Sequence, residues 1–211
     1  MWVSNSLRNE IKVEVVWRQA LEKTAALLLL VVLLVPLMFL SVLLFASSGP
    51  EVIFRQERVG KNGRRFKIWK FRTMVRGAYA AHGELLHKRV SEGGSFLLKS
   101  INDARVTRSG RWLRKYHIDE VLQLVNVLRG EMSLVGPRPM LPEELEHLPA
   151  KAFSRFEVLP GMTGLAQVHG GGRLDPADYL EYDEEMVRDM SIRLYWRVLL
   201  WTPAAVLRGR G

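Results

Sequence analysis

Asp119 and Glu120 are adjacent carboxylates in a strongly basic chain, and they are its first candidates for chemistry. If the pair opens a helix, the helix dipole favours both ionised forms, and the free N–H groups of the first turn favour a phosphate nearby. Neighbouring side chains on a helix point about 100° apart, so the two carboxylates are expected to have separate tasks. The competing interpretation is that they are only acidic residues at a helix start, which is a common arrangement.

Several basic side chains could bind an anionic substrate beside this pair. Arg114 lies five residues before Asp119, about one and a half helical turns away, and is the best candidate for a phosphate clamp. Arg138 stands between Pro137 and Pro139 in a loop that must be extended, so its guanidinium has little entropy to lose on binding. Weaker candidates, which could equally contact lipid headgroups, are Lys70, Arg72, Arg105 and Arg108.

The composition limits the chemistry further. The 211 residues include 31 Lys and Arg against 22 Asp and Glu, a formal charge of +9, which favours polyanionic partners such as phosphates or anionic lipids. No cysteine is present, which excludes disulfides, cysteine-ligated zinc and thiol catalysis. The five histidines form no pair with metal-site spacing, so any metal is expected to be a hard cation on carboxylates.

An apolar segment, Ala25 to Ala46, is long enough to cross a bilayer. It is not typical of a cleaved signal peptide, so we expect it to be retained, kinked at Pro36. Positive charges flank both sides, which predicts that both ends lie on the cytoplasmic face and that the helix is re-entrant. An ordinary single span remains an equal alternative. The predicted division is a membrane-embedded helical segment, residues 1–50, and a membrane-associated catalytic domain, residues 51–211.

The rest of the chain predicts an α+β fold that is predominantly helical. Val52 to Phe71 reads as a small β-hairpin turning at Asn62-Gly63, and Val75 to Val90 as a helix. Arg111 to Leu128 predicts two short helices that meet near His117.

The C-terminal third contains a predicted strand and two predicted helices. Leu165 to Val168 is strand-like, and after Gly170 to Gly172 we expect a polar helix carrying Tyr179 and Asp183. Aromatic residues and arginines mix from Met190 to Leu207, which is typical of an amphipathic helix in the headgroup layer. A helix packed into the core is nearly as consistent with this pattern.

Together these blocks resemble the bacterial sugar transferase family, the monotopic phosphoglycosyl transferases that begin glycoconjugate assembly. The resemblance covers most of the chain after the apolar segment, in family order. The blocks that carry it are Phe54–Gly60, Lys70–Met74, Asp103–Arg111, Leu113–Lys115, Asp119–Glu120, Gln123–Leu128, Gly130–Pro139, Pro160–Gly164 and Ala166–Val168.

The resemblance implies transfer of a sugar 1-phosphate from a UDP-sugar to polyprenyl (undecaprenyl) phosphate at the bacterial inner membrane, with the catalytic domain on the cytoplasmic face. Asp119 matches the nucleophile that forms an aspartyl phosphosugar as UMP leaves, and a carboxylate is a competent phosphoryl acceptor. Glu120 has a supporting role, through metal binding or polarisation. Mg²⁺ is the implied cofactor, with Asp119 and Glu120 as its candidate ligands, and Pro137-Arg138-Pro139 lies at the nucleotide end.

Some positions depart from the family pattern. His117 and Ile118 precede the carboxylate pair where a serine is common, and Val121-Leu122 replaces Leu-Pro. Val35 stands where a serine often precedes the membrane proline, so re-entrance rests more heavily on Pro36.

Two other functions compete with the transferase. A membrane-anchored basic module could bind nucleic acid or anionic lipid without chemistry, but it would gain nothing from Asp119-Glu120 in its basic face. We therefore expect no nucleic-acid partner. An inactive member acting as a scaffold is disfavoured by the intact carboxylate pair and by Pro137-Arg138-Pro139.

Overall fold

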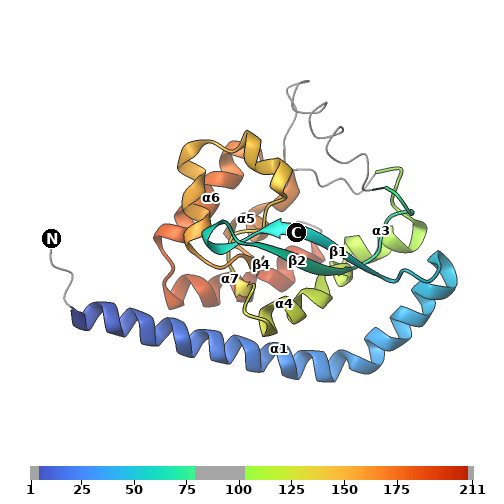
Figure 1. The fold of residues 1–211 in the computed structure, drawn as a ribbon, viewed down its shortest axis with the longest axis horizontal. Coiled ribbons are helices and arrows are strands. Elements are labelled where there is room, and N and C mark those ends of the chain that lie inside the picture. Colours follow the sequence, from blue (N-terminus) through green and yellow to red (C-terminus); the bar gives the residue numbers. More distant parts are fainter. Residues whose placement is uncertain (1–4, 79–102, 209–211) are drawn as a thin grey trace.

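A long N-terminal helix runs beneath the rest of the chain. The structure, a computed structural model, describes residues 5–78 and 103–208, with side chains from residue 16 onward. Helix α1 (Asn5–Ser48) is continuous and contains Pro36, which removes one backbone hydrogen bond and allows a bend. Figure 1 shows that α1 curves, so that its C-terminal part rises beside α3 (Arg108–Lys115). The long apolar N-terminal helix is therefore confirmed, and it extends well beyond the apolar segment Ala25 to Ala46.

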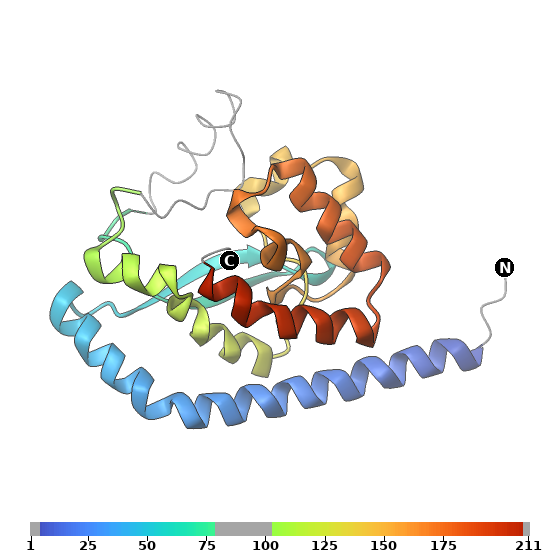
Figure 2. The same ribbon diagram turned by 180° about the vertical axis from the view of Figure 1, so that it is seen from behind.

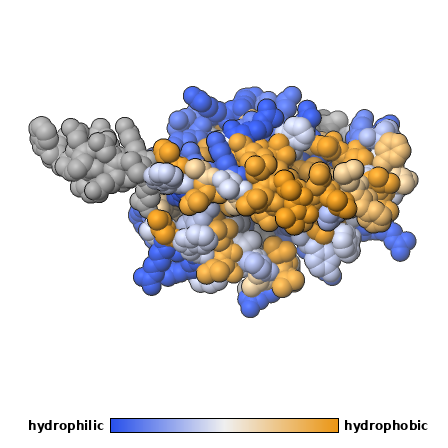
Figure 3. All heavy atoms as spheres, turned by 90° about the horizontal axis from the view of Figure 1, so that it is seen from below, coloured by the Kyte–Doolittle hydropathy of each residue, from blue (hydrophilic) through white to orange (hydrophobic). Residues whose placement is uncertain are grey.

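Helix α1 packs against the domain through one narrow face. Ala26 is buried in a cluster with Leu124 and Val127, and Leu44 is buried in a second cluster with Phe71 and Leu113. The segment Val16–Ser48 is long and apolar enough to cross a membrane, and most of it is exposed. Figure 3, viewed from below, shows the apolar atoms gathered along this side of the molecule. An apolar surface of this size indicates association with a membrane.

The predicted hairpin is confirmed, with a longer loop than expected. Strands β1 (Ile53–Val59) and β2 (Arg65–Phe71) pair antiparallel from Ile53 opposite Phe71 to Val59 opposite Arg65. Between them lies a 3-10 turn, η1 (Lys61–Gly63), in which Asn62 has φ 56° and Gly63 has φ 71°. The Asn-Gly pair supplies the two left-handed conformations that the turn needs, but Gly60 and Arg64 also belong to the loop.

The two predicted helices that meet near His117 are also present. Helix α3 is followed by the 3-10 helix η2 (Ile118–Gln123), which leads directly into α4 (Leu124–Leu128). His117 has φ 54°, a left-handed conformation that ends one helix and redirects the chain into the next. Of the helix predicted for Val75 to Val90, the part from residue 79 lies outside the described residues.

A two-stranded parallel sheet of β3 (Ser133–Val135) and β4 (Gly161–Thr163) corrects one prediction. The strand lies in the Pro-Gly-Met-Thr-Gly loop, and the strand-like Leu165 to Val168 instead belongs to a helix, α5 (Leu165–His169). Four residues are too few to distinguish a strand from a buried helix by periodicity. The connection between the two strands contains η3 (Pro142–His147) and η4 (Ala150–Glu157).

Two helices complete the domain. After η5 (Gly171–Arg173), the predicted polar helix is α6 (Pro176–Arg188), and the aromatic tail is α7 (Ile192–Leu207). Figure 2 shows α7 on the side of the domain that faces α1. Leu194 and Val198 of α7 are buried, whereas Trp196, Leu200 and Leu207 are exposed. One face of α7 therefore packs into the core while the other keeps the apolar character expected of an interfacial helix.

Candidate active site

A cavity of about 1320 Å³ lies between the hairpin, the α3–η2 junction, the loop at Arg138 and helices α1 and α7. It is larger than the roughly 300–1,000 Å³ of ordinary small-molecule sites. Of the predicted site residues, Pro137 lies outside the lining, and the lining includes Lys70, Arg72, Arg105, Arg108, Arg114, Asp119, Glu120, Arg138 and Pro139. The structure thus gathers around one space residues that are up to 69 positions apart in sequence.

The carboxylate pair lies in the first turn of η2, directly after the left-handed His117. Asp119 is 7% exposed and lines the cavity. Glu120 accepts a hydrogen bond from Lys70 of β2, with 3.0 Å between Nζ and Oε1. The two neighbours therefore have different surroundings, as their angular separation on a helix predicts.

Arg114 is held by the backbone turn that follows β2. Its Nε donates to Oγ1 of Thr73 at 2.9 Å, and it lines the cavity. Helix α3 can approach this closely because Gly110 has no Cβ. A Cβ at this position would lie 2.1 Å from the Thr73 carbonyl oxygen. Burial lowers the pKa of Arg114, although the charges of Asp119 and Asp103 raise it. A partly buried cation beside Asp119 favours binding of an anion.

Two further ion pairs involve arginines that line the cavity, Arg105 and Arg72. Arg105 binds Asp103 through Nε and Nη2, and the hydrogen bond from Arg105 lowers the pKa of Asp103 to about 2. Arg72 pairs with Glu51. Both arginines were predicted as weaker substrate contacts, and both carry a carboxylate partner of their own, which reduces the positive charge that they offer to a ligand.

The loop of Arg138 is fixed by backbone contacts to the Pro160–Gly164 segment. Gly136 donates to the carbonyl of Thr163, and Gly161 donates to the carbonyl of Pro137, each at 2.9 Å. A Cβ at Gly161 would lie 2.0 Å from the Gly136 nitrogen, so the two loops touch because both positions lack a side chain.

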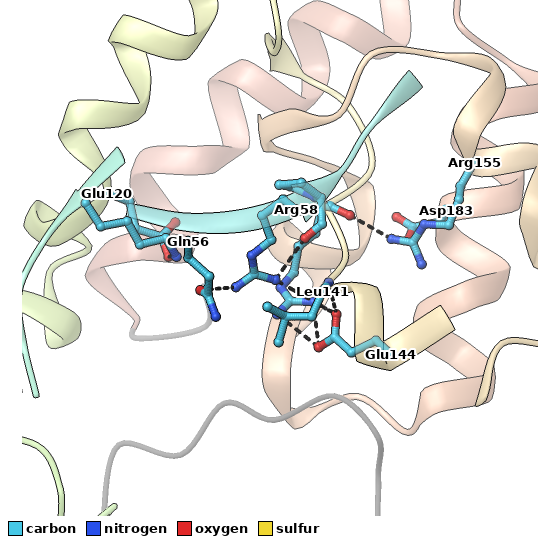
Figure 4. A network of polar contacts seen from close by, with 10 residues as sticks. Gln56, Arg58, Glu120, Leu141, Glu144, Arg155 and Asp183 are labelled. Atoms are coloured by element: carbon cyan, nitrogen blue, oxygen red, sulfur yellow. Dashed lines mark hydrogen bonds and ion pairs between the residues drawn. The ribbon is translucent and has the colours of Figure 1, made fainter. Parts of the chain in front are cut away.

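A buried carboxylate holds the Arg138 guanidinium. Glu144 of η3 is 0% exposed and accepts from Nη1 of Arg138 at 3.2 Å and from the Leu141 backbone at 2.7 Å. Arg58 of β1 lies 3.9 Å from the same carboxylate and donates to Gln56 at 2.9 Å. Figure 4 shows these side chains running from Gln56 through Arg58 to Glu144. Burial lowers the pKa of Arg138, but the charges of Glu144, Tyr179 and Glu120 and the hydrogen bonds to Glu144 together outweigh burial and raise the pKa.

A second buried pair lies behind the first. Arg155 of η4 and Asp183 of α6 are 2.7 Å apart, with side chains 2% and 1% exposed. Burial raises the pKa of Asp183 to about 6, although the charges of Arg155 and Arg138 lower it. Burial likewise raises the pKa of Tyr179, which lies one turn earlier on α6.

The comparison with known proteins decides the family. The sequence profile described as "Bacterial sugar transferase" matches residues 13–209. The chain belongs to the bacterial sugar transferase family. It is 36% identical over 194 residues to the uncharacterized sugar transferase EpsL of Bacillus subtilis, across 92% of this chain and 89% of EpsL.

Two longer relatives in this family have names that describe a reaction. The chain is 38% identical over 186 residues to the UDP-galactose-lipid carrier transferase of Erwinia amylovora, across 86% of this chain and 39% of that protein. It is 36% identical over 188 residues to the undecaprenyl-phosphate galactose phosphotransferase of Salmonella typhimurium, across 87% of this chain and 39% of that protein. The chain thus spans about two fifths of the length of these relatives.

The carboxylates that line the cavity are compatible with an Mg²⁺ ion that is bound partly by substrate. Among residues 16–78 and 103–208, no group of three or more His, Asp or Glu side chains gathers as a metal site. Mg²⁺ in phosphate-transferring sites needs only one or two carboxylates, because substrate phosphates and water complete its shell. Asp119 and Glu120 line one cavity and meet that requirement.

Several residues that hold the transferase site together are not among the predicted site residues. Thr73, Gln56 and Arg58 lie in the sequence blocks that resemble the family, and the resemblance could have indicated them. Glu144 and Arg155 lie outside those blocks. Nothing in a sequence marks a carboxylate such as Glu144 as fully buried. Its spacing of six residues after Arg138 was the one accessible hint.

Proposed function

We propose that this transferase moves a sugar 1-phosphate from a UDP-sugar to a polyprenyl phosphate. The donor and acceptor named for its relatives support the general reaction. The observation that carries the proposal is the position of Asp119, a carboxylate at the wall of a cavity that is lined by arginines and also reaches the apolar helices α1 and α7.

In the first step, a carboxylate oxygen of Asp119 forms a bond to the β-phosphorus of the donor. The bond between that phosphorus and the bridging oxygen breaks, and UMP leaves with the electron pair. In the second step, an oxygen of polyprenyl phosphate attacks the same phosphorus, which gives polyprenyl-diphosphate-sugar and returns the free carboxylate. Division into two steps means that the two anionic substrates need not react with each other directly.

The neighbouring side chains have complementary roles in this proposal. Arg114, fixed by Thr73 close to Asp119, stabilises charge on the transferring phosphate. Arg138 binds the nucleotide end of the donor. Mg²⁺ would be held by Asp119 and Glu120 together with the diphosphate, and when bound it would neutralise charge on the departing phosphate. Lys70 holds Glu120 in place and offsets part of its negative charge.

The apolar part of the cavity lining supports a lipid acceptor. Leu29 and Leu33 of α1 and Leu199 and Val206 of α7 line the same space as Asp119. These helices carry the most exposed apolar surface among the described residues. A phosphate on an isoprenoid chain could therefore reach the carboxylate while its hydrocarbon stays in an apolar environment.

Contacts on both sides of Pro36 support re-entrance of α1 from the cytoplasmic face. Glu22 accepts a hydrogen bond from Ser133 at 2.7 Å, and Leu44 packs with Phe71 and Leu113. A straight helix would separate these positions by about 33 Å along its axis, roughly the thickness of a bilayer core. Cysteines introduced at Ser4 and Gly63 should react with an impermeant reagent from the same face, and reaction from opposite faces would establish a span.

A donor screen tests the proposed reaction. Purified protein in detergent with Mg²⁺ and polyprenyl phosphate is offered a panel of UDP-sugars, and UMP is measured with and without the acceptor. We expect one or a few UDP-sugars to give UMP in amounts that rise with the acceptor. Absence of UMP across the panel, with vesicle or nucleic-acid binding retained, would favour the non-catalytic basic module instead.

A further inference from the structure

We infer that Glu144 and the Arg155–Asp183 pair are positioning residues that orient Arg138 toward the donor. None of the three is a predicted site residue, and Glu144, Arg155 and Asp183 are absent from the cavity lining. The inference rests on the proposed function, because it concerns how the donor site is held in shape.

The backbone of the Arg138 loop is restrained at three consecutive carbonyls. The Pro137 carbonyl accepts from the backbone N–H of Gly161 at 2.9 Å. The Arg138 carbonyl accepts from Nη2 of Arg155 at 2.9 Å, and the Pro139 carbonyl accepts from Nη1 of Arg58 at 3.1 Å. The three donors come from β4, η4 and β1, so the loop is fixed by separate elements, and the two prolines restrict its φ angles.

The side chain of Arg138 is restrained separately by Glu144. Both carboxylate oxygens lie within 3.3 Å of Nη1, and Oε1 is also 3.3 Å from Nη2. Glu144 has no exposure of its own and is tied to the Leu141 backbone, so it cannot follow the guanidinium if that group moves. Such a fixed carboxylate selects one orientation of Arg138 before any substrate arrives.

The charges of this cluster do not balance. It contains the guanidinium groups of Arg58, Arg138 and Arg155 and the carboxylates of Glu144 and Asp183, a net charge of +1. The side chains of Arg58 and Arg155 are 7% and 2% exposed, whereas that of Arg138 is 22% exposed and lines the cavity. Of the three guanidinium groups, that of Arg138 is therefore the one that an anion in the cavity can reach.

Asp183 acts at one remove from the loop. Its carboxylate forms an ion pair with Nη2 of Arg155, the same nitrogen that donates a hydrogen bond to the Arg138 carbonyl. Figure 4 shows Arg155 between Asp183 and the loop. Loss of the Asp183 charge should therefore have the smaller effect, because Asp183 restrains the loop only through Arg155. Loss of Glu144 should have the larger effect, because Glu144 contacts the Arg138 guanidinium directly.

A double-mutant cycle tests this inference with UMP release by the full chain as the readout. Glu144→Gln is made in the wild-type protein and in Arg138→Gln, and KM for the donor and kcat are measured for each. We expect each single change to raise KM about tenfold with kcat within about twofold, and the double variant to match Arg138→Gln alone. A further tenfold rise in the double variant would show that Glu144 acts independently of Arg138 and would overturn the inference.

Two additional variants keep this test decisive. Asp183→Asn, expected to raise KM about threefold in wild type and not at all in Arg138→Gln, takes the place of Glu144→Gln if that variant does not fold. Glu57→Gln removes an exposed carboxylate–arginine pair of the same hairpin and should leave both constants unchanged. If the wild-type protein releases no UMP, the proposed function fails and the inference with it, whereas an active protein with additive variants overturns the inference alone.

Discussion

The cavity has two charged walls that are built from the same residue types but differ in where the charge lies. On the Asp119 wall, formed by β2, α3 and η2, the charged groups line the cavity itself and pair with one another or with a hydroxyl. On the Arg138 wall, the carboxylates of Glu144 and Asp183 are buried behind the surface, and Arg138 reaches the cavity.

The pKa values of two aspartates reflect this difference. The hydrogen bond from Arg105 lowers the pKa of Asp103 on the first wall to about 2, whereas burial raises that of Asp183 on the second to about 6. A partly solvated pair stabilises its charges, and a fully buried pair does so only at a desolvation cost. The first wall is therefore suited to chemistry on a moving phosphate, and the second to a fixed recognition site.

The largest effect should follow from removal of the proposed nucleophile on the Asp119 wall. Asp119→Asn keeps the size of the side chain but takes away the nucleophilic oxygen, so UMP release should fall by at least about a thousandfold. The thermal unfolding midpoint and membrane association should stay unchanged. Turnover near that of the wild type would remove Asp119 as nucleophile and with it the functional contrast between the walls.

The next effect separates the two arginines. Arg114→Gln should lower kcat about a hundredfold, because Arg114 acts on the phosphate during transfer. Arg138→Gln should mainly raise the donor KM, by about tenfold, because Arg138 binds the donor in ground and transition states alike. Steady-state kinetics with the donor identified in the screen give both constants. If the two variants changed the same constant to the same degree, the proposed division of labour would be wrong.

A third prediction concerns the pair of Lys70 and Glu120, which lies on the Asp119 wall. Glu120→Gln removes a candidate Mg²⁺ ligand and should raise the Mg²⁺ concentration for half-maximal activity about tenfold. Lys70→Met removes the competing ammonium and should lower it. Both are measured by titration of Mg²⁺ after chelation. Unchanged Mg²⁺ dependence in both variants would exclude Glu120 from metal binding.

The smallest effect is the pH dependence of stability from the two aspartates. Because the folded protein holds the Asp183 proton more tightly than the unfolded chain does, this group stabilises the fold fully below about pH 4 and loses that contribution as the pH rises through 6. The Tm of Asp183→Asn relative to that of wild type should therefore rise, by roughly several degrees, as the pH is raised from 4.5 to 7.5. The charged and titratable groups that face Asp183 are Arg155, Arg138 and Tyr179.

Asp103 has the opposite sign and provides the matched control. Its folded pKa of about 2 lies below the ordinary value, so its contribution is present above about pH 4 and lost as the pH falls toward 2. Asp103→Asn should cost a constant amount, roughly 1–2 kcal/mol after allowance for solvent screening, from pH 4.5 to 7.5. Parallel behaviour of the two variants would contradict the contrast between surface and buried pairs.

The Asp119 wall was largely predictable from the sequence, and the Arg138 wall was not. Asp119, Arg114 and Lys70 belong to motifs with recognisable spacing, and the turn at Asn62-Gly63 and the bend at Pro36 follow from local backbone preferences. Glu144 and Arg155 acquire their roles only when η3 and η4 fold behind the Arg138 loop, and apart from the spacing of Glu144 after Arg138 nothing in the sequence indicates that arrangement. Leu165 to Val168 was assigned wrongly for a similar reason, because packing rather than propensity makes it helical.

The bond between Asp119 and phosphorus can be observed directly. The protein is incubated with Mg²⁺ and its UDP-sugar in the absence of polyprenyl phosphate, quenched in acid and digested, and the peptides are analysed by mass spectrometry. We expect the peptide that contains Asp119 to gain the mass of the sugar phosphate, to lose it on addition of polyprenyl phosphate, and to remain unmodified in Asp119→Asn. An adduct on another residue, or donor turnover with an unmodified Asp119 peptide throughout, would contradict the account.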